Sequence, residues 1–213
     1  MKLTKYGHAC IFIEHSGKKL VIDPGAFTEL PQDLSNVVAV VYTHMHGDHV
    51  DSGNLDLLVK ANKDLTVYAE AETMSELAGV ECNKVVIDKT QDITVDDFEL
   101  SLYYIDHAVI WKTSPCKNLA VKVNDFYYYP GDTFHVIDQQ VQIAGVPVSA
   151  PWLKLTEAIQ FVHDVKANKV IPTHNGLMND AGHMVAHSVL SNFTKESGKE
   201  LVVLKDKDEI DSQ

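Results

Sequence analysis

The segment Thr43–His49, with the sequence THMHGDH, concentrates four potential metal ligands within six residues. They are three imidazoles and one carboxylate: His44, His46, Asp48 and His49. Such side chains at this spacing are typical of a metal site, and a solvated histidine-rich turn is the alternative. The apolar run Val37–Tyr42 directly precedes the segment and predicts a buried strand. The fold must therefore present these ligands at the tip of a buried strand.

The spacing within this segment favours two ions over one. In a non-helical loop, His44 and His46 can turn toward one point, because the small Gly47 follows them. Asp48 and His49 reach beyond that point toward a second one. A catalytic zinc site uses three protein ligands and a water, so two ions that share a water need about six or seven protein ligands. About three further ligands are therefore expected downstream.

Three candidates for these ligands stand directly after predicted strands: His107, Asp132 and His174. The alternative for His107 is a capping or packed histidine, and the alternative for Asp132 is a simple turn former after Gly131. Their repeated place at strand tips, the same place that His44 occupies, favours ligand roles.

Several other polar residues have a more ordinary interpretation. Asp23 ends a β-hairpin predicted for residues 9–22, and its local chemistry favours a turn former. His8 alone is more typical of a surface or packed histidine than of a functional one. His183 and His187 are four residues apart on a predicted helix, but the Glu of a metalloprotease motif is missing between them. That absence favours a solvated helix face.

The rest of the chain alternates between predicted strands and helices. We expect strands at residues 9–14, 19–22, 37–42, 65–69, 84–87, 93–95, 98–105, 119–123, 126–129, 141–148, 169–172 and 201–204. We expect helices that begin at Asp51 or Ser52 and that span residues 70–78, 157–166 and about 182–195. Residues 108–118 lack periodicity and suit a loop over a site, and the charged residues 205–213 predict a frayed tail.

Composition limits the class of protein. The 213 residues, 45% of them hydrophobic, suit one domain that spans residues 1–213. A net charge of -12 disfavours long nucleic acid or an anionic membrane as partner, although two divalent cations would still permit a small anionic substrate. No signal-peptide core or membrane-spanning apolar run is present, which favours a cytoplasmic protein. Cys10, Cys82 and Cys116 are odd in number and predict reduced thiols.

Taken in order, these motifs resemble the metallo-β-lactamase-fold superfamily over nearly the whole chain. The five motifs are Asp23 after a hairpin, the Thr43–His49 cluster, His107, Asp132 within Gly131-Asp132-Thr133, and His174 within Ile171-Pro172-Thr173-His174. The opening Gly7-His8-Ala9 and the Asp23-Pro24-Gly25 turn are similar to the small bacterial metal-dependent hydrolases of that superfamily, a group that includes ascorbate-6-phosphate lactonase-like proteins. An Asp rather than a Cys at position 132 disfavours a secreted β-lactamase.

The resemblance implies an α/β (α+β) fold, a four-layer αββα sandwich with metals at one edge of two facing sheets. It implies a first ion on His44, His46 and His107, a second on Asp48, His49 and His174, and Asp132 bridging them. Asp23 would orient the cluster through hydrogen bonds. Zinc is the first choice of metal, with manganese or iron as alternatives for imidazole and carboxylate ligands.

The expected function is therefore that of a dinuclear metal-dependent hydrolase, which uses a metal-bound hydroxide on a small ester, lactone or phosphoester. A phosphorylated sugar lactone is the specific case that the resemblance suggests. The alternatives are a small-nucleotide phosphodiesterase and a non-catalytic metal-binding sensor. Asp48 is the candidate proton carrier, and His8, His135 and Lys112 are candidates for contacts with substrate. A homo-oligomer remains open, because Trp152 and the run Tyr127–Tyr129 suit either an interface or internal packing.

Overall fold

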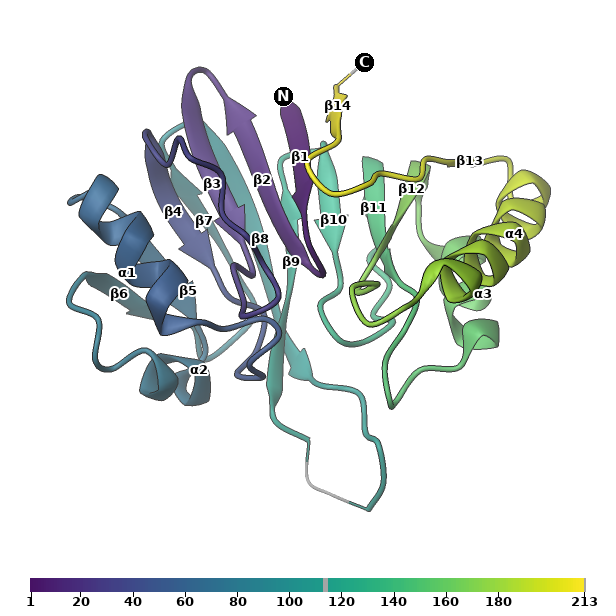
Figure 1. Ribbon diagram of the computed structural model, residues 1–213, viewed down its shortest axis with the longest axis horizontal. Coiled ribbons are helices and arrows are strands. Elements are labelled where there is room, and N and C mark those ends of the chain that lie inside the picture. Colours follow the sequence, from purple (N-terminus) through teal and green to yellow (C-terminus); the bar gives the residue numbers. More distant parts are fainter. Residues whose placement is uncertain (113–114, 213) are drawn as a thin grey trace.

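Two β-sheets packed face to face form the centre of the structure (Figure 1). The computed structural model describes residues 1–112 and 115–212. Within them, the first sheet has seven strands, in the spatial order β14 (Glu209–Asp211), β1 (Lys2–Tyr6), β2 (Cys10–His15), β3 (Lys18–Ile22), β4 (Val37–Val41), β5 (Thr66–Ala69) and β6 (Asn83–Val86). Strands β3 to β6 are parallel to one another, and β1, β2 and β3 are joined antiparallel.

The second sheet also has seven strands among the described residues. Their spatial order is β13 (Glu200–Leu201), β12 (Ala167–Thr173), β11 (Val141–Pro147), β10 (Tyr127–Tyr129), β9 (Lys117–Val123), β8 (Phe98–Asp106) and β7 (Gln91–Val95). The helices that accompany the two sheets are α1 (Ser52–Ala61), α2 (Ala71–Glu76), α3 (Leu155–Asp164) and α4 (Asp180–Glu196). None of the helices in residues 1–112 and 115–212 is long and apolar enough to cross a membrane.

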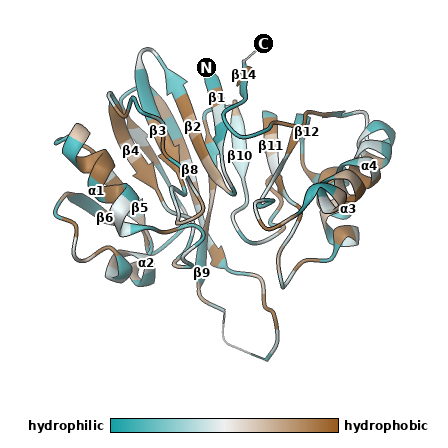
Figure 2. Ribbon diagram, in the orientation of Figure 1, coloured by the Kyte–Doolittle hydropathy of each residue, from teal (hydrophilic) through white to brown (hydrophobic). Residues whose placement is uncertain are grey.

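Three apolar layers hold the molecule together, one between the sheets and one under each pair of helices. Alternation along β2 shows how this arises: Ile11 and Ile13 face the second sheet, whereas Cys10 and Phe12 face the side of α1 and α2. Helices α3 and α4 cover the other sheet, and apolar residues concentrate on the strands and inner helix faces (Figure 2). The predicted four-layer αββα sandwich is confirmed.

Parallel pairing brings the functional loops to one edge of both sheets. Strands β3 and β4 are parallel, as are β10, β11 and β12, so their carboxyl ends lie together. The long strand β8 ends at the same edge, at the bottom of Figure 1. The loops that follow β3, β4, β8, β10 and β12 therefore converge there.

The two ends of the chain differ from the sequence prediction. Strand β1 was not expected. The frayed tail predicted for residues 205–213 is wrong for the described residues, because β14 pairs antiparallel with β1, and Gln213 lies outside the described residues. The Lys2 ammonium lies 3.3 Å from Glu209, and the amino terminus donates a hydrogen bond of 2.8 Å to Ser212 Oγ. An edge strand leaves one row of charged side chains in solvent, so its sequence is similar to that of an unstructured tail.

Smaller differences concern element boundaries. The predicted loop at residues 108–118 connects β8 to β9, although β9 already begins at Lys117, and Thr113 and Ser114 lie outside the described residues. Asp51 rather than Ser52 caps α1, accepting a hydrogen bond of 2.7 Å from the Asn54 backbone. Helix α3 begins at Leu155, two residues before the predicted start.

Candidate metal centre

Four loops bring the seven predicted ligands to one place. The loop after β4 carries His44, His46, Asp48 and His49, and the loops after β8, β10 and β12 carry His107, Asp132 and His174. The ligand atoms form three groups, in each of which all atoms lie within 4.8 Å of one another. These groups are His44, His46 and His107; His44, His49 and Asp132; and His8, Asp48, His49 and His174.

Asp132 lies between the first and last of these groups. Its Oδ2 is 3.5 Å from His107 Nε2 and 4.0 Å from His44 Nε2 on one side, and 3.1 Å from His174 Nε2 on the other. Its Oδ1 is 3.2 Å from His49 Nε2. Two ligand atoms that each lie about 2.0–2.2 Å from one tetrahedral ion are about 3.3–3.6 Å apart. These separations suit a carboxylate shared by two ions.

Asp23 ties the β3 loop to the histidine loop. Its carboxylate, fully buried, accepts hydrogen bonds from the Thr43 backbone N–H, the Thr43 hydroxyl and His49 Nδ1, each 2.7 Å long. In the same β3 loop, the backbone of Gly25 packs directly against the histidine loop, and a Cβ at Gly25 would lie 2.0 Å from the Asp48 carbonyl oxygen. A side chain at Gly25 would therefore push the histidine loop away. Asp23 orients the cluster rather than merely forming a turn.

Hydrogen bonds at Nδ1 fix the tautomer of four histidines. The Nδ1–H groups of His44, His49, His107 and His174 donate to Thr43 Oγ1 (3.0 Å), Asp23 Oδ2 (2.7 Å), the Ala108 carbonyl (2.6 Å) and the Ser149 carbonyl (2.5 Å). Each neutral ring is thereby left with a lone pair on Nε2. All four Nε2 atoms are buried and have no hydrogen-bond partner among the described residues. These unpaired Nε2 lone pairs face one another and two carboxylates, so bound cations would provide the partners that the protein does not.

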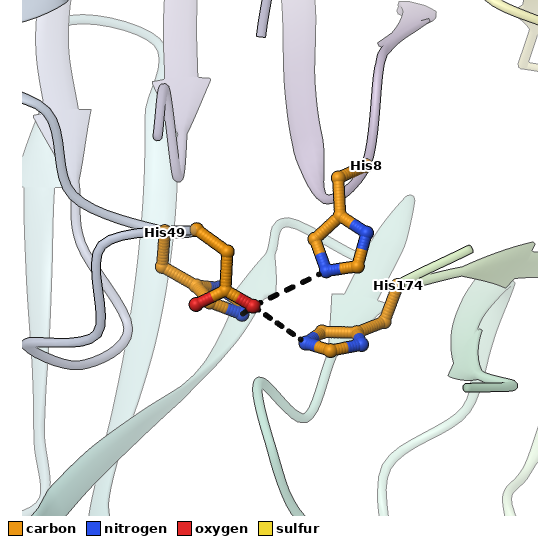
Figure 3. Close-up of side chains that lie close together, drawn as sticks. His8, His49 and His174 are labelled. Carbon is orange, nitrogen blue, oxygen red and sulfur yellow. Dashed lines mark ion pairs between the residues drawn. The ribbon is translucent and has the colours of Figure 1, made fainter. Parts of the chain in front are cut away.

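His8 has the opposite tautomer. The Gly176 backbone N–H donates to His8 Nδ1 at 2.8 Å, so the neutral ring carries its proton on Nε2. This Nε2 lies 3.3 Å from Asp48 Oδ2, and the ring lies against His174 with centroids 3.9 Å apart (Figure 3). A protonated nitrogen cannot bind a metal ion. His8 is therefore a fully buried donor beside Asp48, not an eighth ligand and not a surface histidine.

Two residues that sequence reasoning did not assign to the site hold Asp132 in place. Trp152 Nε1–H donates to Asp132 Oδ2 at 2.9 Å, so this tryptophan contacts a predicted metal ligand. The Asn118 side chain accepts from the Asp132 backbone N–H at 3.0 Å and donates to the Pro130 carbonyl at 2.9 Å. Gly131 has a φ of +67°, and a Cβ there would lie 2.2 Å from Asn118 Oδ1. The Gly-Asp pair was the only sequence signal for this arrangement.

The carboxylates give the centre a field that attracts positive charge. Burial lowers the pKa of His49, but Asp132 and Asp23 outweigh this effect and raise the pKa well above its usual range. Burial also lowers the pKa of His174, but the carboxylates of Asp132 and Asp48, which face its Nε2 and favour the protonated ring, outweigh this effect and raise the pKa to about 9. Without metal these rings hold protons, and bound cations would replace those protons.

Other candidates lie apart from the cluster. His135 packs against Tyr103, with ring centroids 5.6 Å apart, and Lys112 lies over the ring of the exposed Trp111. His135 is not part of any of the three ligand groups found among the described residues. The contacts of His135 and Lys112 with substrate stay predictions. His183 and His187 are partly exposed on α4 and line a cavity beside it.

Comparison with known proteins agrees with this architecture. A relative from Mycobacterium tuberculosis is 28% identical over 202 residues, which cover 91% of this chain and 93% of the relative. A Pyrococcus furiosus protein named as a UPF0173 metal-dependent hydrolase is 28% identical over 197 residues, covering 82% of this chain and 84% of that protein.

Solved structures have the same fold at lower identity. Igni18, a metallo hydrolase from Ignicoccus hospitalis, aligns with a TM-score of 0.74 at 17% identity over 98% of this chain and 97% of that one. The metallo-β-lactamase fold protein YhfI from Bacillus subtilis aligns with a TM-score of 0.75 at 15% identity over 98% of each chain. The family model of the beta-lactamase superfamily domain matches residues 2–174. This chain therefore belongs to the metallo-β-lactamase superfamily.

Proposed function

We propose that this protein is a metal-dependent hydrolase that binds two divalent cations and cleaves a small ester, lactone or phosphoester. The observation that carries the proposal is the convergence of four imidazole Nε2 lone pairs and two carboxylates in one buried place. The names of similar proteins, which include metal-dependent hydrolases, support the same reaction class. Zinc is the first choice of metal, and manganese or iron would suit the same donors.

Bound divalent cations supply two kinds of chemistry, because they lower the pKa of water toward neutrality and polarise a carbonyl or phosphoryl oxygen. His44, His46 and His107 would hold one ion, Asp48, His49 and His174 the other, and Asp132 would contact both. With hydroxide available in this way, the hydrolysis needs no nucleophile from the protein.

Asp48 is the residue best placed to move a proton. Its side chain is 22% exposed, so it contacts solvent while its Oδ2 lies 3.3 Å from the Nε2 atoms of His8 and His174. Burial raises the pKa of Asp48, but His174 and His8, whose Nε2 atoms face this carboxylate, outweigh the effect of burial and lower the pKa well below its usual range. An ionised carboxylate at neutral pH can accept a proton from the attacking water, and the proton on His8 Nε2 keeps that carboxylate oriented.

His46→Ala tests the proposal, because His46 is the exposed ligand of the centre and its loss should not disturb the core. We expect loss of hydrolysis and of bound metal in this variant. His163→Ala is the matched control, since the His163 side chain is 71% exposed on α3. Full activity of His46→Ala, or of the protein after chelation, would refute the proposal.

A substrate panel separates the finer alternatives. We propose a lactone or ester with an anionic group, such as a phosphorylated sugar lactone, and a small-nucleotide phosphodiester is the alternative substrate. Comparison of kcat/KM for lactones, aryl esters and bis-phosphodiesters distinguishes them. Tight metal binding without turnover across the whole panel would favour a metal sensor instead.

A further inference from the structure

A cavity of about 660 Å³ lies beside the metal centre, on the other side of His8. It is enclosed by the end of β1, residues 203–206 and one face of α4. His8 belongs to both places, because its ring lines the cavity and its Nε2 lies 3.3 Å from Asp48 Oδ2. The cavity has a volume typical of small-molecule sites and adjoins the reacting groups.

Lys5 lines this cavity and is a buried cation without an ion pair. It is 2% exposed, and its ammonium donates to the Gly7 carbonyl. No ion pair joins it to a carboxylate among residues 1–112 and 115–212. Burial lowers the pKa of Lys5 against the attraction of Asp206, whose Oδ1 already accepts the Gly7 backbone N–H at 2.7 Å. A buried charge of this kind is costly unless an anion accompanies it.

Two histidines of α4 face the same cavity. His183 and His187 are one turn apart, with ring centroids separated by 5.5 Å. Burial, then His183, then the charge of Lys5 lower the pKa of His187, and Lys5 and His187 both line the cavity. His187 Nε2 is buried and has no hydrogen-bond partner among the described residues. Lys5 and the two rings thus offer hydrogen-bond donors to one region of the cavity.

The remaining walls favour a ligand that is partly apolar. Phe27 and Val203 line the cavity and are 51% and 44% exposed, and the buried Leu204 lies beside them. The charged residues Asp180, Lys205 and Asp206 also line the cavity and are exposed, whereas Lys5 is buried. The cavity therefore combines one buried cation with apolar walls.

We propose that this cavity binds a small organic oxyanion with an apolar body, through Lys5, His183 and His187. The fully buried His8 lies between the cavity and the metal centre, and none of the predicted metal ligands lines the cavity. The anion site is therefore separate from the place where the proposed hydrolysis would occur.

Binding of phenylphosphonate, with benzyl alcohol as the uncharged counterpart, tests the cavity separately from hydrolysis. The full chain is titrated by calorimetry both with metal and after chelation, and the ring C–H signals of His183 and His187 are followed by NMR. We expect phenylphosphonate to bind in both states and to shift both histidines, and benzyl alcohol to bind more weakly. This result stands even if the protein hydrolyses nothing, so the two proposals fail separately.

Lys5→Met removes the charge and keeps an apolar side chain of similar length. Loss of one charged hydrogen bond predicts roughly 10- to 100-fold weaker phenylphosphonate binding in the chelated protein. Lys207→Met is the matched control, because Lys207 pairs with Glu29 at 3.4 Å and does not line the cavity. His187→Gln provides a second variant, also expected to weaken binding, if Lys5→Met does not fold. Unchanged affinity in both folded variants, or binding that disappears on chelation, would overturn the proposal.

Discussion

Trp152 offers a sharp test of how the metal centre is built. Its Nε1–H donates to Asp132 Oδ2 at 2.9 Å, and its ring lies 5.3 Å from that of Phe134 and 6.2 Å from that of His107. Trp152→Phe removes the hydrogen bond and retains an aromatic ring for the packing contacts. The variant therefore isolates the contribution of one donor to a carboxylate that is 4% exposed.

The size of the effect follows from the chemistry of that carboxylate. A hydrogen bond to a charged group contributes about 1.5–3 kcal/mol. Among the described residues, Trp152 is the side-chain donor to Asp132 that would remain beside a metal ion. Loss of a residue that orients a metal ligand typically weakens metal affinity by about 10- to 100-fold, which is the same range in free energy. We expect weakening of that size in Trp152→Phe, with the fold retained.

Competition with a chromophoric zinc chelator measures this affinity directly. Trp111→Phe is the matched control, because Trp111 is 72% exposed and its ring contacts Lys112. Its metal affinity should equal that of the wild type. If Trp152→Phe binds zinc as tightly as the wild type, or if Trp111→Phe loses as much affinity, the account of Asp132 is wrong.

Three further predictions concern other parts of the chain. Asp23→Asn removes the negative charge and leaves one acceptor oxygen for the three groups that donate to Asp23. We expect the ion on the His49 side to be lost first, so that metal analysis after gel filtration gives about one ion per chain. Two retained ions would argue against this role of Asp23. Removal of the metal by a chelator should lower Tm in a scanning fluorescence experiment, because a metal ion at 1,000 times its Kd stabilises the folded state by about 4 kcal/mol. An unchanged Tm would contradict a metal that binds only the folded state. Burial, with the charges of Glu72 and Glu70, raises the pKa of the Cys116 thiol to about 11. Its thiolate fraction at pH 8 should therefore be about a hundredfold below that of an ordinary thiol, and the rate of iodoacetamide labelling should increase up to about pH 11. Rapid labelling at pH 8 would show that the thiol is more acidic than this.

Local pattern was enough to locate the ligands because each of them follows a buried strand. An apolar run such as Val37–Val41 is recognisable from its own residues, and parallel pairing then places its tip beside the others. The resemblance to a known superfamily supplied the order of the motifs, and the observed topology agrees with it.

The features that the sequence did not predict all depend on distant partners. Strand β14 is recognisable only through its pairing with β1, about 200 residues earlier in the chain. Trp152 acquires its role through Asp132, and His8 owes its tautomer to the Gly176 backbone N–H. His135 and Lys112 were selected because they are near motifs in sequence, and their contacts with substrate stay predictions.

The central claim is that the loops at one sheet edge hold a pair of cations. Anomalous diffraction at the zinc absorption edge, from crystals of the metal-loaded protein, tests it most directly. We predict two anomalous peaks about 3.5–4 Å apart, one beside His44, His46 and His107 and the other beside Asp48, His49 and His174, with Asp132 between them. A single peak, or peaks away from these residues, would contradict the account.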